Sequence, residues 1–277
     1  MWEVLIIGTV IGGIWALVAS GFSLTFGVAR IFNFAHGTYF AIAAYLAAAL
    51  YPTLGYFSIF LAIFAAGIFG LVVNVLIKPI RDREIMVILL TLSVALSVEQ
   101  ILLIIFQDTS ISIPPVINGV VEIAGVPVTY TRIIALIIAL LCLAALEIFI
   151  GKTRLGREIN ATSQSSEAAM MVGIDVEKVY SSTMLISAIL AGIGGVLYAQ
   201  IYSVNPETAF RILIFAFAVV ILGGLGSIKG SIIAAFLIGY VQTFVSIVLG
   251  SRWSEVAVIA VIIAILIVRP RGLFGVE

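Results

Sequence analysis

The side chains best suited to chemistry meet in one short stretch, "FNFAHGTYF", which contains Asn33, Gly37 and the single histidine of the chain, His36. An imidazole can transfer protons near neutral pH or bind a metal ion. One histidine cannot build a histidine-based metal site, however, and the sequence has no H-E-x-x-H and no G-x-S-x-G pattern. We therefore predict no catalytic or metal centre and no enzyme activity. Asn33 is suited to cap a helix that starts here, with His36 and Gly37 in its first turn.

A second polar group, Glu99 and Gln100, interrupts the apolar run "TLSVALSVEQILLIIF". A carboxylate at bilayer depth costs roughly 2.5–3.5 kcal/mol on insertion scales, so Glu99 is predicted to be paired or protonated. Two interpretations remain open: a structural hydrogen bond between helices, or the lining of a polar path. Glu147 lies near the end of another apolar run, and we expect it to reach the membrane surface or to pair with Lys152 or Arg154.

A glycine cluster in "VVILGGLGSIKGSIIAA" forms the third unusual feature. Such a cluster breaks a transmembrane helix and frees backbone groups, which only protein or a water-filled cavity can satisfy. Lys229 precedes Gly230 and Ser231, which is the wrong order for a phosphate-binding P-loop, so this chain is predicted not to hydrolyse ATP itself. We predict that broken helices at 33–37 and 223–230 line or gate a translocation path, with Glu99 near the midplane of the membrane. The predicted path residues are Asn33, His36, Gly37, Glu99, Gly223, Gly224 and Gly226.

The elements that must position these residues are membrane-spanning helices. Hydrophobic residues make up 63% of the 277-residue chain and charged residues 10%, and the mean hydropathy is +1.29. Soluble domains are roughly 45–50% apolar and about 25% charged. The long apolar runs exceed the strands of a membrane barrel. The sequence therefore predicts an all-α integral membrane protein, and its zero net charge gives no sign of nucleic-acid binding.

About nine spans are predicted, or eight if either the short seventh span or the eighth, which meet at the glycine cluster, is only a half-span or re-entrant piece. The first run has no basic leader segment or cleavage pattern, and we expect it to be a retained span. The predicted spans are roughly 3–28, 33–51, 57–77, 85–106, 132–151, 179–202, 211–223, 229–249 and 253–268.

Lysine and arginine indicate the orientation, because these residues gather on the cytoplasmic side. They follow the third, fifth and last predicted spans, which lie on one side if there are nine. We therefore predict a multi-pass protein with its N-terminus outside and its C-terminus inside. The cations that carry this prediction are Arg30, Lys78, Arg81, Arg83, Lys152, Arg154, Arg157, Lys178, Arg269 and Arg271.

Two loops stand out by length. The external loop, 107–131, alternates apolar and polar residues around Gly125, which predicts a small β-hairpin. The cytoplasmic loop, 152–178, contains a pattern for a short helix: Ser165 or Ser166 as N-cap, Glu167 in the first turn and Gly173 past the end. A helix of two turns is marginal alone, so we expect it to dock on a protein surface.

Three stretches of the chain together resemble the permease subunits of branched-chain amino acid ABC importers. They are "GFSLTFGVARIFNFAHGTYFAIAAYLA", "TRLGREINATSQSSEAAMMVGIDVEKV" and "VVILGGLGSIKGSIIAAFLIG", and they occur in the order and at the spacing of that family. Among these permeases the chain is most similar to the smaller, first subunit. The resemblance implies one permease domain over residues 1–277, in the cytoplasmic membrane.

The resemblance also implies partners: a second related permease, two cytoplasmic ABC ATPases that use the ATP, and an external substrate-binding protein. The chain itself would need no cofactor. In the cytoplasmic loop, the run from Glu167 to Gly173 resembles the coupling helix of ABC importers, which docks on the ATPase. The coupling residues implied are Ser165, Ser166, Glu167, Ala168, Ala169 and Gly173.

The substrate implied by the resemblance is a branched-chain or other small neutral amino acid. Permeases for simple sugars share the broad fold, and importers of urea or short amides are close relatives, so these substrates stay open. A stand-alone secondary transporter or channel explains the broken helices and Glu99 equally well, but it gives no reason for a short helix in the cytoplasmic loop. An intramembrane enzyme has only Glu99 and His36 in its favour.

Overall fold

The computed structural model describes residues 1–107, 109–268 and 272–274, and within them the chain is mostly helical. Nine long helices in this part of the chain correspond to the nine predicted spans, and each observed boundary lies within three residues of the predicted one. These helices are α1 (Trp2–Ala29), α2 (His36–Leu54), α3 (Phe57–Ile77), α4 (Glu84–Phe106), α5 (Tyr130–Lys152), α8 (Val176–Ile201), α9 (Thr208–Gly223), α10 (Ile228–Val248) and α11 (Ser251–Val268).

Among the described residues, seven of these helices are long and apolar enough to cross a membrane. The other two, α9 and α11, are apolar helices of 16 and 18 residues. The polytopic all-α membrane fold is therefore confirmed. Arg269 and Arg271, which contribute to the predicted charge bias, lie outside the described residues.

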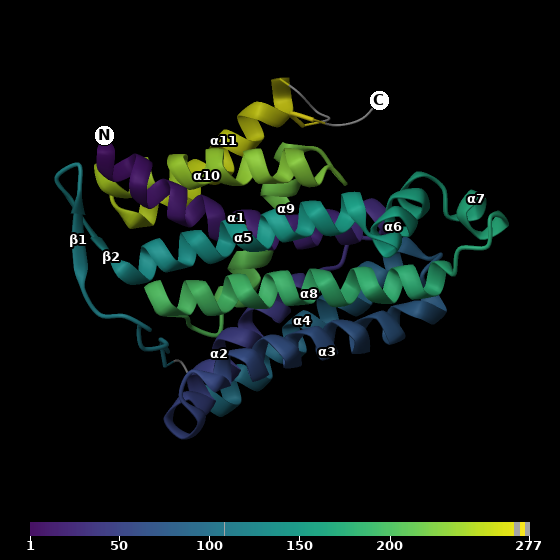
Figure 1. Cartoon of the computed structure of the whole chain (residues 1–277), viewed down its shortest axis with the longest axis horizontal. Coiled ribbons are helices and arrows are strands. Elements are labelled where there is room, and N and C mark those ends of the chain that lie inside the picture. The colour runs from purple at the N-terminus through teal and green to yellow at the C-terminus, as the bar shows by residue number, and fades with distance from the viewer. Residues whose placement is uncertain (108, 269–271, 275–277) are drawn as a thin grey trace.

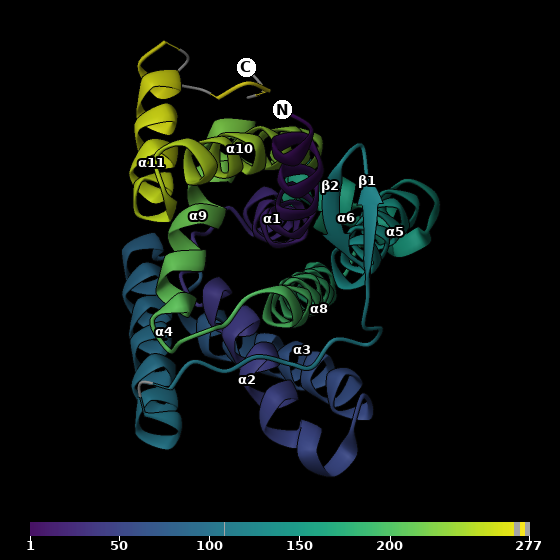
Figure 2. The same ribbon diagram turned by 90° about the vertical axis from the view of Figure 1, so that its left-hand side faces the viewer.

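Helix α1 lies at the centre of the bundle, surrounded by α5, α8, α9 and α10 (Figures 1 and 2). Its contact with α10 depends on small residues: Gly8 lies against Tyr240, and Gly12 lies against Phe236. In a bilayer, such residues let helix backbones approach closely without any ligand. Most helices run along the long axis, but α9 crosses the bundle from α2 and α4 towards α10, so that it stands upright in both views (Figures 1 and 2).

The two ends of the bundle differ in structure (Figure 1). One end carries Met1 and the predicted hairpin, and we call it the hairpin end. Strands β1 (Val120–Ile123) and β2 (Val126–Thr129) pair in antiparallel register there, joined by a two-residue turn in which Ala124 and Gly125 both have positive φ. This is the turn geometry that matches the twist of a hairpin. The loop before β1 is held to the bundle by a bridge between Ile111 and Val204.

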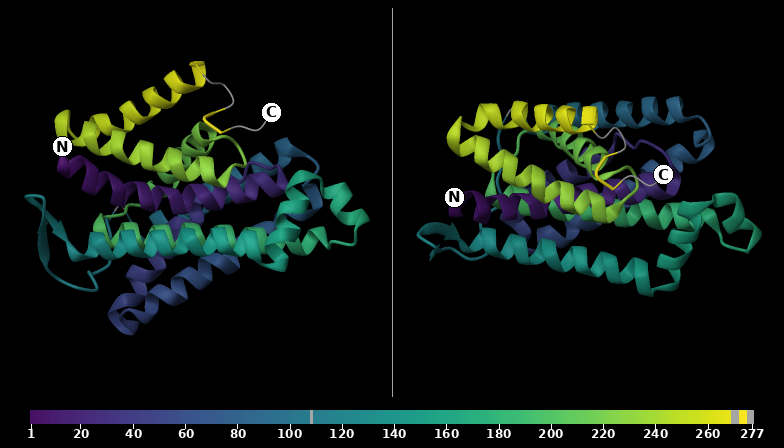
Figure 3. Two further views of the ribbon diagram at one scale, coloured as in Figure 1. Left: turned by 45° about the horizontal axis from the view of Figure 1, so that its top comes forward. Right: turned by 90° about the horizontal axis from the view of Figure 1, so that it is seen from above.

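The opposite end carries two short helices, α6 (Arg154–Gln164) and α7 (Ser166–Met171), and we call it the α7 end (Figure 3). A short 3₁₀ helix, η1 (Lys78–Ile80), follows α3 at the same end. Helix α7 is the short helix predicted from the sequence, whereas α6 was not predicted. The hairpin and α7 therefore lie at opposite ends of the bundle, as the predicted topology requires.

One predicted ion pair is wrong. Glu147 pairs with Lys229 at 3.1 Å, and not with Lys152 or Arg154. Lys229 lies in the first turn of α10, which brings its side chain to the end of α5 at the same level of the bundle. Both side chains are more than half exposed, so the pair contributes at most about 1 kcal/mol to stability.

Candidate coupling and translocation sites

Helix α7 is built as a short, capped helix at the tip of the bundle. The Ser165 hydroxyl accepts a hydrogen bond from the Ala168 amide at 3.1 Å, which confirms Ser165 as the N-cap. At the other end, Gly173 adopts φ +84°, a conformation that favours glycine, and the Ile174 amide closes the helix on the Ala169 carbonyl. Two turns with both ends capped give a defined shape to a helix too short to be stable alone.

The surface of α7 is apolar although it lies beyond the long helices. Met170, Met171 and Val172 are 55%, 82% and 76% exposed. Ala169, in contrast, is buried and turns towards the rest of the chain. Adjacent exposed apolar side chains at a protruding tip are typical of a surface that docks on another protein.

Helix α6 connects α7 to the bundle. Its N-cap Thr153 accepts from the Gly156 amide at 2.9 Å, and Ile159 buries its side chain among the long helices. Ser163 accepts a hydrogen bond from Arg30 at 3.2 Å through its carbonyl oxygen. Arg30 begins the turn between α1 and α2, so this hydrogen bond joins α6 to that turn.

The same end holds a polar cavity of about 380 Å³ between α6, α7, the turn after η1, the first turns of α8 and the end of α1. Arg81 lies on its wall, bound to Glu177 at 2.6 Å and stacked 4.1 Å above the Tyr180 ring. Arg81 also donates to the buried Asn74 side chain. These contacts attach η1 to the start of α8, so the cavity has one fixed wall and one wall formed by the α6–α7 unit.

His36 lies at the start of α2, fully buried between α1 and α8. Its Nε2 is 2.8 Å from the Val18 carbonyl oxygen, and its Nδ1 is 3.3 Å from the Ser187 hydroxyl. A carbonyl oxygen only accepts, so Nε2 must carry the proton and Nδ1 accepts from Ser187. The neutral imidazole therefore links three helices. Gly21 allows this approach, because a Cβ there would lie 3.1 Å from the imidazole.

Replacing His36 by alanine is expected to destabilise the folded protein by about 2–3 kcal/mol, from a buried cavity and two lost interhelical hydrogen bonds. Thermal unfolding of the detergent-solubilised protein measures this change. His36 has no exposed surface in the described conformation, so the transport rate per folded protein is the second measurement. A reduced rate per folded protein would assign His36 to the gate, whereas an unchanged rate would leave it a purely structural link between helices.

Asn33 holds the turn before α2 in shape. Its side-chain oxygen accepts from the Ala35 amide at 3.1 Å, as predicted for a capping residue, although the helix itself starts at His36. Its amide nitrogen donates to the Tyr39 hydroxyl at 2.9 Å. The next residue, Phe34, donates its backbone N–H to Thr91 of α4 at 3.1 Å. The stretch is thus the junction of α1, α2 and α4.

Glu99 lies in the half of α4 nearer the hairpin end, seven residues before its last residue, Phe106. At 1.5 Å per residue this is about 10 Å from the helix end. Glu99 and Thr38 line a small cavity of about 10 Å³ between α2, α4 and α9, which is of the order that holds one water molecule. Within the described residues the buried Thr38 hydroxyl has no hydrogen-bond partner. Glu99 therefore faces α2, the helix that begins with His36 and Gly37, across this small cavity.

The glycine cluster forms the turn between α9 and α10. Gly224 and Gly226 have φ values of +102° and +83°, and the Ser227 hydroxyl caps α10 by accepting from Gly230 at 3.1 Å. The carbonyl groups freed at the end of α9 accept from the Leu273 and Phe274 amides. Protein thus satisfies the broken backbone, as a bilayer requires.

The predicted path residues fall into two groups in space. Asn33, His36, Gly37 and Glu99 gather around the start of α2 and the facing side of α4. Gly223, Gly224 and Gly226 lie at the far end of α9, where Gly226 contacts Gly27 of α1. Helix α9 connects the groups, since Phe217 in its middle packs on the aromatic rings of the α1–α2 turn.

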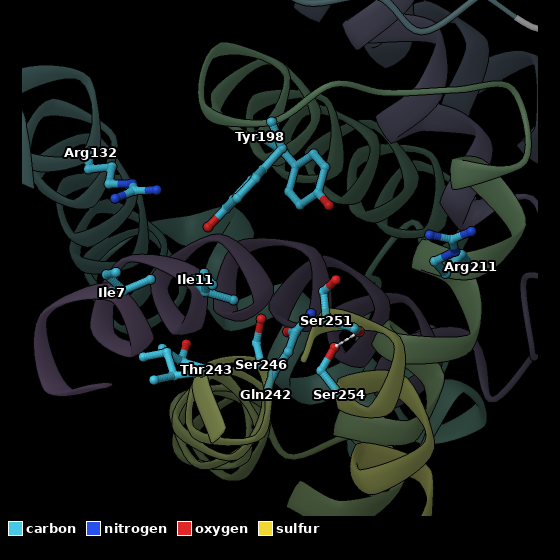
Figure 4. A pocket seen from close by; sticks show the side chains of 12 residues that line it. Ile7, Ile11, Arg132, Tyr198, Arg211, Gln242, Thr243, Ser246, Ser251 and Ser254 are labelled. Carbon is cyan, nitrogen blue, oxygen red and sulfur yellow. Dashed lines mark hydrogen bonds between the residues drawn. The ribbon is translucent and has the colours of Figure 1, made fainter. Parts of the chain in front are cut away.

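A pocket at the hairpin end was not predicted from the sequence. It has a volume of about 390 Å³ and is lined by side chains from α1, α5, α9, α10 and α11, with two tyrosines at the end of α8 (Figure 4). Arg132 and Arg211 flank it, and the Gln242 side chain faces it while accepting from Trp15 at 2.8 Å. Among the described residues that line the pocket none is acidic, and its donors suit a carboxylate-bearing solute.

Comparison with known proteins agrees with this architecture. A family model described as "Branched-chain amino acid transport system / permease component" matches residues 4–266. The chain belongs to this permease family. No solved structure matches the permease.

The permease resembles curated relatives over nearly its whole length. It is 28% identical to the high-affinity branched-chain amino acid permease LivH of Escherichia coli, over 97% of this chain and 93% of that protein. It is 29% identical to BraD of Pseudomonas aeruginosa, over 98% and 94% of the two chains. A nucleoside ABC transporter permease of Lactococcus lactis, NupB, is 35% identical over only 40% of this chain. The family is a family of transport subunits, which agrees with the predicted lack of a catalytic site.

Proposed function

We propose that this permease is a membrane subunit of an ATP-driven importer of branched-chain amino acids. Two cytoplasmic ABC ATPases, a second related permease and an external substrate-binding protein complete the importer. Support for the substrate comes from LivH and BraD, which are named as branched-chain amino acid permeases and match nearly the whole chain. The external partner would select the amino acid, so other small neutral amino acids remain within reach of the same permease.

The single observation that carries the ATP-driven mechanism is the capped, exposed α7 at one end of the bundle. In this mechanism α7 occupies a groove on an ATPase subunit. Closure of the two ATPases upon ATP binding moves α7 and with it α6. The hydrogen bond between Arg30 and Ser163 then passes this movement to the α1–α2 turn, where Asn33 and His36 lie.

The orientation follows from this assignment. With α7 in the cytoplasm, the hairpin and Met1 lie outside, and the last residues that the structure describes, 272–274, lie inside. The substrate-binding protein would dock over the hairpin end, on the loop at 107–131 and on the segment from Asn205 to Arg211. These segments adjoin the pocket flanked by Arg132 and Arg211, where a released amino acid would first meet donors for its carboxylate.

The translocation path would run from that end past Glu99 and the start of α2 to the glycine turn after α9. The residues that we propose for this path are the ones predicted from the sequence: Asn33, His36, Gly37, Glu99, Gly223, Gly224 and Gly226. Weak binding along such a path favours release. In the described conformation the start of α2 is packed closed, so this stretch would act as a gate.

Replacing Glu167 by lysine tests the coupling role. Glu167 lies in the first turn of α7, where a negative charge complements the helix dipole. The reversed charge is expected to lower ATP-driven leucine uptake by roughly tenfold or more, because it changes both helix and docking surface. Uptake is measured in proteoliposomes that contain the assembled importer. Glu84→Lys is the matched control, because Glu84 is also exposed in the first turn of a helix, α4, and it is expected to have a smaller effect. Unchanged uptake in Glu167→Lys would exclude the coupling assignment.

The competing function is a stand-alone secondary transporter or channel. It is distinguished by purifying the permease from its native membrane in mild detergent. Co-purified ATPase subunits and ATP-dependent uptake support the proposal. A permease that purifies alone and transports amino acids with an ion gradient only would contradict it.

A further inference from the structure

Helix α4 is the long helix least integrated into the permease. In the most apolar stretch of 18 residues in α4, 11% of the residues are buried. The corresponding share is 22% for α5 and 33% for α3. It contacts α2, α3 and α9 along one side only. The rest of its surface therefore faces lipid or another protein.

The exposed face of α4 carries a polar stripe in its middle, between exposed apolar residues such as Leu89 and Ile104. Ser93, Ser97 and Gln100 are exposed and follow one another at spacings of four and three residues, which places them on one stripe of the helix. Glu99, the residue before Gln100, is partly buried and turns from this stripe towards the small cavity against α2 and α9. Ser93 satisfies itself by donating to the Leu89 carbonyl of its own helix. Within the described chain, the side chains of Ser97 and Gln100 form no hydrogen bond.

Neighbouring helices show what a lipid-facing surface of this chain looks like. Every exposed side chain of α3 from Phe57 to Leu76 is apolar, and on α5 the exposed residues from Ile137 to Leu141 are apolar as well. Polar side chains at bilayer depth normally face protein or a polar cavity, since hydrocarbon offers no hydrogen bonds. The contrast within one chain indicates that α4 faces protein.

The α4 stripe belongs to a larger face of the molecule. Helices α4 and α11 lie on the same side of the bundle and flank α9 (Figure 2), and both run along one edge when the molecule is seen from above (Figure 3, right). A shallow groove of about 70 Å³ continues this face between α9 and α11. We call the surface formed by α4, α9 and α11 the α4–α9–α11 face.

Charges are divided across this face. Glu99 and Glu207 interact electrostatically on the α4 side. Arg211 lines the groove towards α11, and Arg252 is exposed in the first turn of α11. A two-fold axis along the bundle and in front of α9, between the two subunits, places the α4 of one subunit against the α11 of the other. The acidic side then meets the basic side, so the face complements itself as a two-fold interface requires.

We propose that the α4–α9–α11 face is the surface on which the second permease subunit packs, with Gln100 and Ser97 bound to polar groups of that subunit. The inference rests on the proposed function, because it names the surface for a partner proposed there. It also places Glu99 and its cavity beside the interface. The path would then be bordered by both permeases and not enclosed within one.

The test uses a photo-activated amino acid, p-benzoylphenylalanine, placed at Ser97 or Gln100 in the importer as it assembles in its native membrane. Matched controls carry the same probe at Phe64 of α3 and Leu141 of α5, which are 66% and 64% exposed on apolar faces. After irradiation we expect adducts between positions 97 or 100 and a permease peptide from α9 to α11. Positions 64 and 141 are expected to give no permease adduct.

Two results would overturn the inference. One is adduct formation at 97 and 100 with lipid alone, while ATPase subunits still co-purify; that result leaves the proposed function intact. The other is a permease adduct at 64 or 141 in place of 97 and 100. As a second measurement, the double variant Ser97→Leu with Gln100→Leu is expected to weaken permease–permease association about tenfold, as lost polar contacts in a membrane predict. The apolar change Phe64→Leu should leave association unchanged.

Discussion

Replacing Met171 by aspartate is expected to separate the permease from its ATPase subunits and to lower ATP-driven uptake by roughly a hundredfold. Met171 is 82% exposed at the tip of α7, between the exposed Met170 and Val172. A carboxylate buried in an apolar docking groove without a partner costs several kcal/mol, and about 2.7 kcal/mol already corresponds to a hundredfold loss of binding. Because the side chain contacts little of its own chain, the change should leave the fold intact.

Three measurements on this variant distinguish docking from folding. Co-purification reports ATPase binding, proteoliposome uptake reports function, and the thermal midpoint of the isolated permease reports the fold. Met171→Leu keeps the apolar surface and a similar volume, so it is the control expected to retain both association and uptake. Normal ATPase binding by Met171→Asp would show that the apolar tip of α7 is not the docking surface.

The spans were predictable because each long helix is continuous and apolar. Even the short α9 and the break after Gly223 appeared in the sequence, since few patterns other than a helix end place so many glycines together. The hairpin was equally predictable from the alternation of apolar and polar residues and from Gly125 in the turn. Each of these features depends on residues close together in the sequence, so a short sequence pattern is enough to predict it.

Helix α6 was missed because it lies in a polar segment without the length of a span. Thr153 as N-cap and the buried Ile159 were its signals, and both were hidden between the basic residues of that loop. The ion pair of Glu147 shows a different limit. Its partner, Lys229, lies far along the chain, and only the packing of α10 beside α5 brings the two together.

The candidate sites show the same division. Ser165 and Gly173 could be placed from the sequence because caps act within a few residues. The surroundings of His36 could not, because Val18 and Ser187 belong to other helices. The pocket at the hairpin end could not be predicted from the sequence, because its lining comes from six helices and no contiguous motif marks it.

Replacing Gly239 by leucine is expected to prevent α1 and α10 from packing and to destabilise the folded permease by about 3 kcal/mol or more, as overpacking of a rigid contact does. A Cβ at this position would lie 2.6 Å from the Gly12 nitrogen and 2.7 Å from its Cα. Both atoms are backbone, so no side-chain rotation relieves the contact. The two helices would have to separate along the centre of the bundle, because α1 is the helix around which the others pack.

A second glycine provides the control for this prediction. Gly151 is also helical, in α5, but a Cβ there meets no atom within 4 Å. Gly151→Leu is therefore expected to leave the thermal midpoint and the yield of monodisperse protein unchanged, whereas Gly239→Leu lowers both. Equal behaviour of the two variants would contradict the close approach of α1 and α10. Gly8 of α1 belongs to the same contact, because a Cβ there would lie 3.1 Å from the Tyr240 backbone. Gly8→Leu is therefore expected to lower the thermal midpoint and the yield as Gly239→Leu does.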